Sequence, residues 1–199
     1  MQKTQIALFP LQIFLLPGER TRLHIFEDRY RQLLQDCENT SISFGIPYAL
    51  NGYLTGYGCV VKVVQIVERH ANGSADIEIE AEQIFKLNQF YMRMGDKLYP
   101  GGDVAIIDEQ DMGLISDDLM KRLDALFLKE KGKIDKKLLS PFTGILDVAQ
   151  VLNLSEAEKL SLIKAGTPEK RERLITNVIK LKEKLLEQEK SIRGEIFLN

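Results

Sequence analysis

LFPLQIFLLPGERTRLHIFEDRYRQL, residues 8–33, contains the strongest local signals in the chain. Two short apolar runs, residues 6–9 and 13–16, are each followed by a proline, and residues 22–26 are a third extended candidate. Short apolar runs separated by turn residues are typical of buried strands. Apolar side chains then recur at helical spacing, which predicts a helix over residues 27–38. The segment therefore indicates short strands that lead into one helix.

Strand patterns continue as far as about residue 107. Residues 42–47 are one candidate, and residues 57–67 are rich in Val and Ile, as a central strand would be. Residues 76–82 alternate, with acidic side chains on one face and Ile or Ala on the other. Residues 84–94 and 104–107 add two more candidates, which brings the total to six or seven. That many short strands favours a small β-barrel.

The apolar spacing changes to that of helices from about residue 114. Ser116 is placed to cap the first of them, and a short helix is expected over residues 146–152. Between these helices, residues 129–137 contain five lysines, and we expect a solvated connection there. The second part of the chain is therefore predicted to be helical.

The helical part ends with two capped helices. Ser155 and Glu158 have capping-box spacing, and Thr167 stands before a proline at the predicted start of the last helix. One face of that helix carries Leu174, Val178, Leu181 and Leu185. We expect this stripe to pack within its own bundle, with a partner helix as the alternative. The resulting fold class is α+β, with a β-barrel subdomain in residues 1–112 and a helical bundle in residues 113–199.

Composition and charge favour a folded protein whose main role is not phosphate binding. Hydrophobic residues make up 44% of the 199 residues and charged residues 28%, enough to fill a core and cover it. The net charge is −2, and residues 1–110 hold 10 Lys and Arg against 14 Asp and Glu, a balance of −4. Domains that bind nucleic acid usually carry a basic excess. We therefore expect no nucleic-acid partner.

Cysteine use and apolar runs predict a cytoplasmic protein without a membrane segment. Cys37 and Cys59 are the only cysteines, too few for a disulfide-dense secreted scaffold. Residues 6–16 are apolar, but prolines interrupt them and no small-residue cleavage site follows, which favours buried strands over a targeting segment. No other run approaches the roughly 18 apolar residues that span a bilayer.

No pattern of catalytic or cofactor-binding residues stands out. The chain lacks a phosphate-binding loop, and residues 56–58 lack the third glycine of a dinucleotide fingerprint. His24 and Glu27 have a metal-compatible spacing without an obvious third ligand, and His70 lies in a predicted turn without a partner. The acidic side chains of residues 76–82 diverge along a strand, so a solvated face is favoured over a cation site. We therefore expect no catalytic residue, no metal and no cofactor.

Residues 48–57 have the composition of an adaptable recognition loop. They hold three of the six tyrosines of the chain among Gly, Asn and Thr. The candidate polypeptide-binding residues are Tyr48, Tyr53 and Tyr57. In the alternative interpretation, these tyrosines lie against the barrel in an ordinary connection.

The opening segment also resembles a known family. The Phe-Pro-Leu run at 9–11, the Leu-Pro-Gly turn at 16–18 and the Ile-Phe-Glu-Asp-Arg-Tyr run at 25–30 are similar to the start of the LON substrate-binding domain. That domain is the N-terminal part of the ATP-dependent protease Lon and also occurs alone. The likeness continues through residues 44–46 and 57–60 into the helical part, so it covers nearly the whole chain.

The resemblance implies a PUA-like six-stranded β pseudo-barrel followed by a C-terminal α-helical bundle. In that fold the prolines turn strands, and Phe26 and Tyr30 pack the helix on the barrel. The signature residues, expected to be structural, are Pro10, Leu11, Pro17, Gly18, Phe26, Glu27, Arg29 and Tyr30. Residues 81–85 depart from the family, because they read AEQIF where Gly-x-x-Arg-Phe is common. The contact of that arginine is therefore not carried over.

The resemblance also implies a function. Lon contains an ATPase module and a peptidase module, and no segment of this sequence resembles either. We therefore expect a non-catalytic, protein-binding module that recognises unfolded polypeptide or a partner protein. Two alternatives stay open: an RNA-binding PUA-like barrel, and a small-molecule enzyme with a carboxylate pair in the barrel mouth.

Overall fold

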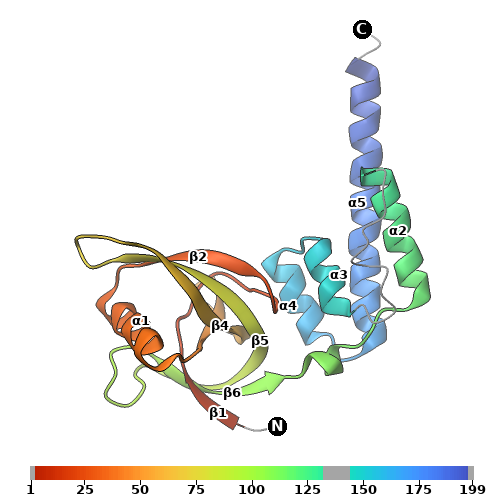
Figure 1. Ribbon diagram of the computed structural model, residues 1–199. Coiled ribbons are helices and arrows are strands. Elements are labelled where there is room, and N and C mark those ends of the chain that lie inside the picture. The colour runs from red at the N-terminus through yellow and green to blue at the C-terminus, as the bar shows by residue number, and fades with distance from the viewer. Residues whose placement is uncertain (1–2, 132–143, 197–199) are drawn as a thin grey trace. The chain divides into compact units, whose positions relative to one another are not determined.

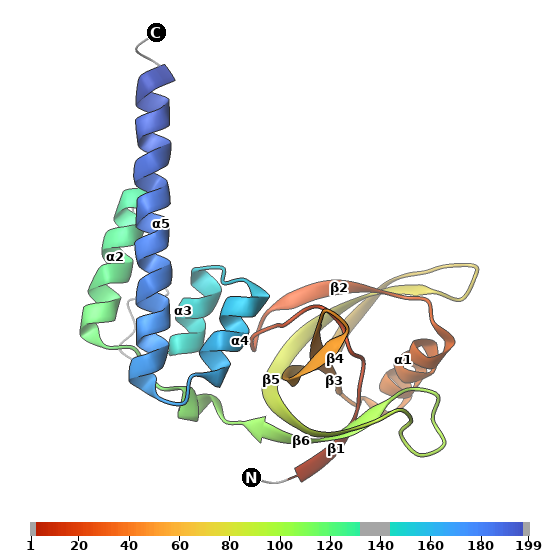
Figure 2. The ribbon, with the colours of Figure 1, turned by 180° about the vertical axis from the view of Figure 1, so that it is seen from behind.

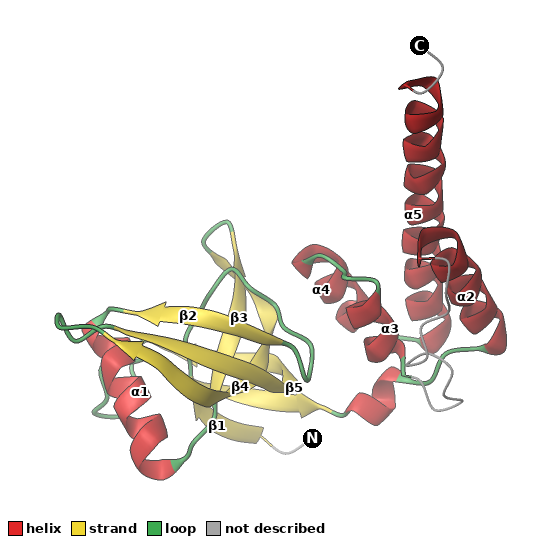
Figure 3. Cartoon of the chain, turned by 45° about the horizontal axis from the view of Figure 1, so that its top comes forward, coloured by secondary structure: helices red, strands yellow, loops and turns green. Residues whose placement is uncertain are grey.

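A computed structural model describes residues 3–131 and 144–196 of the chain, which divides into two compact units, Met1–Asp111 and Met112–Asn199. The six strands lie in the first unit, and helices make up most of the second (Figure 3). The predicted α+β class, a six-stranded pseudo-barrel followed along the chain by helices, is confirmed.

One antiparallel sheet forms the wall of the first unit, in the order β1-β6-β5-β4-β3, with β2 paired to β5. Figures 1 and 2 show this wall curving around the interior, with α1 beside it. The elements are β1 (Lys3–Ala7), β2 (Arg20–Ile25), α1 (Asp28–Thr40), β3 (Phe44–Leu50), β4 (Tyr53–Arg69), β5 (Ala75–Tyr91) and β6 (Gly101–Ile107).

Strand β5 holds the sheet together. β4 pairs along one edge of it, and β2 and then β6 pair along the other. At the gap between β2 and β6, the backbone N–H of Gly18 donates to the carbonyl of Ala81 (2.7 Å), and the N–H of Ala81 donates to the carbonyl of Glu19 (2.9 Å). The backbone of Ala81 is therefore hydrogen-bonded on the part of that edge of β5 that neither β2 nor β6 reaches.

The N-terminal segment closes the barrel against β3. The backbone N–H of Phe9 donates to the carbonyl of Gly45 (2.8 Å), and the N–H of Ala49 donates to the carbonyl of Leu11 (2.8 Å). Pro10 lies between these two contacts and has no N–H to satisfy. The Phe-Pro-Leu run is therefore the seam of the pseudo-barrel.

Burial follows the alternation in the sequence. Ile77, Ile79 and Ala81 of β5 point into the core and are at most 1% exposed. Tyr30 of α1 stacks on Phe9 with ring centroids 3.7 Å apart, which fixes the helix on the barrel. The space left at this contact is about 10 Å³, no more than one water would need.

Two strand predictions are wrong in detail. Residues 13–16 are not part of a strand, although Phe14 and Leu16 are fully buried, so their apolar signal reports burial rather than pairing. Residues 76–82 and 84–94 were expected as separate strands, but β5 runs without a break to Tyr91. Residues 82–84, where the break was expected, read Glu-Gln-Ile and contain no Gly, Pro or Asn to turn the chain, so a single strand is the simpler outcome.

The second unit contains α2 (Asp117–Lys131), α3 (Ile145–Val151), α4 (Glu156–Lys164) and α5 (Pro168–Ile196), preceded by a 3-10 turn at Glu109–Met112. The predicted caps are confirmed. The Ser116 hydroxyl accepts from the N–H of Leu119 (3.3 Å), and Ser155 and Glu158 bond reciprocally as a capping box. The lysine-rich connection lies mostly outside the described residues, and its first three residues belong to α2.

The apolar stripe of α5 packs differently from the prediction. Ile175 and Ile179, one position further along the helix, are the buried residues, at 0% and 2% exposed. Leu181 and Leu185 are about half exposed (55% and 49%). The stripe therefore lies beside the packed face, and only its N-terminal half is partly covered.

Gly58 of β4 provides a test of a close approach between β3 and β4. A Cβ at this position would lie 2.3 Å from the carbonyl oxygen of Ile46 and 2.5 Å from the ring of Phe85. We expect Gly58→Ala to lower the free energy of unfolding by about 1–3 kcal/mol, because β3 must move away from β4. Urea denaturation measures this loss.

Gly166→Ala is the matched control. A Cβ there meets nothing within 4 Å and its φ is not positive, so stability should stay the same or rise slightly. Equal stability of the Gly58→Ala and Gly166→Ala proteins would contradict the close approach of β3 to β4.

Candidate functional site

Most of the family-signature residues lie at the turn before β2 and at the start of α1. Arg29 donates to Glu27 (Nε to Oε2, 2.8 Å), and its guanidinium lies over the ring of Tyr30, 4.6 Å from the centroid. Pro17 and Gly18 form a turn, and Gly18 has the positive φ of 86° that the turn requires. Arg29 therefore links Glu27 and Tyr30 at the start of α1, and Tyr30 in turn stacks on Phe9 of the barrel.

Phe26 does not pack the helix on the barrel, so that expectation is wrong. Its side chain is 59% exposed, and its ring stacks on His24 with centroids 5.9 Å apart. Phe26 immediately follows β2 and precedes the cap of α1, so the chain turns its side chain outward just before the helix begins.

The three candidate tyrosines do not share one surface. Tyr48 is only 4% exposed and lies against Phe14, with ring centroids 5.8 Å apart. Tyr48 is therefore a core residue and not a contact for a ligand, because the bulged end of β3 turns its side chain inward. Tyr57 is half-buried within β4, and Tyr53 is 80% exposed at the start of that strand.

Tyr53 belongs to an exposed apolar hairpin tip. Asn51 and Gly52 form the turn between β3 and β4, and both have positive φ (51° and 81°), which suits a two-residue hairpin turn. The register places Leu50 opposite Tyr53. Leu50 is 46% exposed and Leu54 36%. We define Leu50, Tyr53 and Leu54 as the hairpin tip, a small apolar surface held by a defined turn.

Two hollows lie elsewhere. One of about 300 Å³ separates the C-terminal end of α1 from β4 and is lined by Cys37, Ile42 and Ile66, among others. Burial raises the pKa of the Cys37 thiol to about 11, so it stays protonated and is not a nucleophile at neutral pH. The other, about 330 Å³ and mostly apolar, lies between α4 and α5 beside Leu162 and Val178.

The acidic face of β5 is paired rather than free. Glu80 accepts from Arg20 of β2 (Nε to Oε2, 2.7 Å) and lies 3.0 Å from the Nζ of Lys62 of β4. Hydrogen bonds from Lys62 and then Arg20 lower the pKa of Glu80. Every carboxyl pKa with a resolved shift among the described residues is lowered, the opposite of what a general acid needs.

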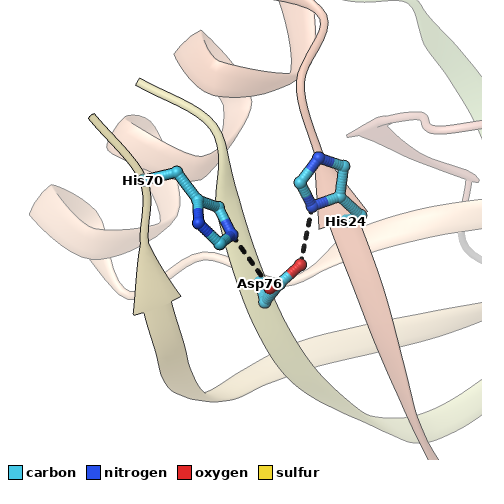
Figure 4. A group of neighbouring side chains, drawn as sticks. All are labelled: His24, His70 and Asp76. Carbon is cyan, nitrogen blue, oxygen red and sulfur yellow. Dashed lines mark hydrogen bonds and ion pairs between the residues drawn. The ribbon is translucent and has the colours of Figure 1, made fainter. Parts of the chain in front are cut away.

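His24, His70 and Asp76 form a cluster that no pattern in the sequence predicted (Figure 4). The Nδ1 of His24 lies 2.6 Å from Oδ1 of Asp76, and the Nε2 of His70 lies 2.9 Å from Oδ2 of the same carboxylate. The expectation that His70 has no carboxylate partner is therefore wrong. These hydrogen bonds, first that of His24, lower the pKa of Asp76.

Strand pairing explains the cluster. β2 and β5 pair with His24 opposite Asp76, and the turn at residues 71–74 returns the chain so that His70 comes beside it. Across the β4–β5 hairpin, Glu68 is the residue opposite Asp76, and His70 reaches the carboxylate from the start of the turn. Nothing in the sequence alone gave the register of β2 on β5.

A family model described as the ATP-dependent protease La (LON) substrate-binding domain matches residues 5–181. The chain belongs to this family. The resemblance seen in the opening segment is confirmed, and its long Phe-Pro-Leu and Ile-Phe-Glu-Asp-Arg-Tyr runs are the seam and helix start described above.

Solved structures agree in fold. A Lon N-terminal domain protein from Xanthomonas campestris is 26% identical, with 87% of this chain and 98% of that chain covered and a TM-score of 0.63. The N-terminal domain of a Mycobacterium avium complex Lon protease is 16% identical, with 89% and 98% covered and the same TM-score, and shows the fold alone. No curated protein matches the LON-family chain in sequence. None of its described helices is long and apolar enough to cross a membrane.

The loop between β5 and β6 is tied to α1 through Asp36. The Tyr99 hydroxyl donates to Oδ2 of Asp36 (2.7 Å), and the Nζ of Lys97 lies 3.0 Å from the same oxygen. These bonds, first that of Tyr99, hold the pKa of Asp36 below its ordinary value. The loop also exposes Met92 (75%) and Leu98 (46%) next to this anchor.

We expect Tyr99→Phe to lower the free energy of unfolding by about 1–2 kcal/mol at neutral pH, because Asp36 loses a buried donor. A carboxyl with a lowered pKa contributes stability above its unfolded pKa and loses it as pH falls through the folded value. The difference between wild type and variant should therefore shrink below about pH 4. Denaturation across pH measures it, with Tyr53→Phe as the exposed control. A difference independent of pH would contradict the role of Asp36.

Proposed function

We propose that this LON-family protein is a non-catalytic recognition module that binds exposed apolar segments of polypeptide, with the hairpin tip as a contact surface. The observation that carries the proposal is the hairpin tip itself within a substrate-binding-domain fold: Leu50 and Tyr53 lie opposite each other and stay exposed. Tyrosine supplies a large amphipathic surface at low entropic cost, as recognition surfaces require.

The hairpin tip suits a weak and adaptable contact. Its turn is fixed by Asn51 and Gly52, so the apolar side chains are presented without ordering a flexible loop on binding. Small apolar surfaces of this kind recognise many sequences, because apolar contact has little directionality. A protein partner of apolar, extended character is therefore the class of ligand that the surface favours.

The remaining features support binding over turnover. About 10 Å³ is left in the barrel beneath α1, and the carboxyl groups with resolved shifts have lowered pKa values. Cys37 and Cys59 are both buried and are thiols rather than a disulfide, which fits a reducing compartment and supports a cytoplasmic location as part of the proposal.

RNA binding is supported less well than polypeptide binding. Residues 1–110 carry a balance of −4, with 10 Lys and Arg against 14 Asp and Glu. Arg20 and Lys62 are already paired with Glu80, so they are not free for phosphates. A salt-sensitive affinity for single-stranded RNA in the submicromolar range would reverse this ranking.

The test titrates the protein with reduced, carboxymethylated α-lactalbumin, which stays unfolded, and with native α-lactalbumin. Fluorescence anisotropy or calorimetry reports binding. We expect the unfolded form alone to bind, and Tyr53→Ser to weaken binding about tenfold, the loss typical of one aromatic contact.

Met92→Ser is the matched control, because Met92 is comparably exposed (75%) on a different loop. If both variants weakened the affinity for unfolded α-lactalbumin equally, the binding would be nonspecific apolar adsorption rather than a site at the hairpin tip. If the wild-type protein did not bind unfolded α-lactalbumin, the proposed function would be wrong.

A further inference from the structure

We propose that His24, His70 and Asp76 bind a divalent transition-metal ion, with Zn²⁺ as the first candidate. The three side chains come from β2, the end of the β4–β5 hairpin and β5, and their rings and carboxylate turn toward one another (Figure 4). Their donor atoms all lie within 4.8 Å of one another. This site does not depend on the hairpin tip or on polypeptide binding.

The present spacing is close to that of a metal site. Zn²⁺ binds imidazole nitrogen and carboxylate oxygen at about 2.0–2.2 Å, so neighbouring ligand atoms in a tetrahedral site lie roughly 3.4 Å apart. The two nitrogens now lie 2.6 Å and 2.9 Å from the oxygens of Asp76 as hydrogen-bond partners. Small side-chain rotations would therefore let an ion take the place of the hydrogen-bonding protons, which would move to the other ring nitrogen or to solvent.

The surroundings permit those rotations. The side chains of His24, His70 and Asp76 are 51%, 31% and 34% exposed, so an ion reaches them from solvent without opening the barrel. The strands behind them are fixed by the register of β5 with β2 and β4. The backbone is thus preorganised, while the ligand side chains remain free to adjust.

Glu68 supplies an outer partner for one ligand. Its Oε1 lies 3.7 Å from the Nδ1 of His70, on the side of the ring away from Asp76. When His70 binds through Nε2, its proton stands on Nδ1 and points toward Glu68. A carboxylate behind a histidine in this way orients the ring and raises its basicity as a ligand.

The donor set selects the class of metal. Two imidazole nitrogens and one carboxylate oxygen suit Zn²⁺, Ni²⁺, Co²⁺ or Cu²⁺, whereas Ca²⁺ and Mg²⁺ need mainly oxygen ligands. The chain has two histidines in all, both in this cluster, and Cys37 and Cys59 are buried. The cluster therefore faces little competition from other soft ligands of the chain.

Three protein ligands leave one tetrahedral position for water or for a side chain of a bound protein. The ion would join β2 to both sides of the β4–β5 turn, where the hairpin extends beside α1 (Figure 1). Metal binding should therefore stabilise this end of the barrel.

The experiment uses the full chain without an affinity tag, treated with chelator and then titrated with ZnCl₂. Calorimetry gives the affinity and stoichiometry, and NMR of the imidazole nitrogens reports the ligands, since only two histidines contribute. We expect one Zn²⁺ per chain, shifts of His24 Nδ1 and His70 Nε2, and a rise in Tm with added zinc. MgCl₂ at the same concentrations should produce none of these changes.

Variants separate the site from nonspecific binding. His24→Asn, His70→Asn and Asp76→Asn should each weaken zinc binding by more than about tenfold, the lower end of losses from outer-shell changes alone. Glu68→Gln should weaken it less. Glu78→Gln is the matched control, because Glu78 is an acid two residues along the same face and should leave the affinity unchanged. Each variant is checked for native stability by thermal unfolding in chelator.

Two results would overturn the proposal. One is the absence of zinc-dependent imidazole shifts in the wild-type protein. The other is zinc binding that survives in the folded His70→Asn and Asp76→Asn proteins, which would place the ion elsewhere.

Discussion

Backbone pairing along β5 is the constraint on which the first unit depends. This strand pairs with β4 on one edge and with β2 and β6 on the other, and the Gly18 turn hydrogen-bonds to Ala81 between the two. A 17-residue strand with partners on both edges must twist and bend, and the bulges in β4 follow that bend. The seam at Phe9 and Gly45 then needs only a few hydrogen bonds to close the wall.

The inward face of β5 packs in the core, and its outward face carries ionic and histidine contacts. Its inward residues, such as Ile77 and Ile79, fill the core that α1 covers through Tyr30. Of its outward acids, Glu80 forms ion pairs with Arg20 and Lys62 of the neighbouring strands. Asp76 forms hydrogen bonds with the histidines. Because side chains alternate strictly along a strand, the ion pairs and the histidine cluster lie on the same outer face. The apolar hairpin tip lies at the turn between β3 and β4.

Much of the fold could be predicted from local patterns. Short apolar runs, Val and Ile content and one alternating stretch indicated the strands, helical spacing and caps indicated the helices, and the opening segment indicated the LON family. The sequence could not tell that residues 13–16 are buried without pairing, because burial and pairing leave the same apolar pattern. It also could not reveal that Tyr48 points inward, since one bulge in β3 reverses which face a residue occupies. The His24–Asp76 contact depends on the register of strands distant in sequence, which no local pattern encodes.

The β5 arrangement also orders the steps by which the chain can fold. β4 and β5 are joined by a short turn, so their hairpin forms from local contacts. The pairing of Arg20 with Glu80 joins residues 60 positions apart, and closing so long a loop has an entropic cost that the early hairpin must offset. β2 is therefore expected to dock onto a template that already exists. In kinetic terms, the residues of β2 would form their contacts late, and their loss would speed unfolding more than it slows folding.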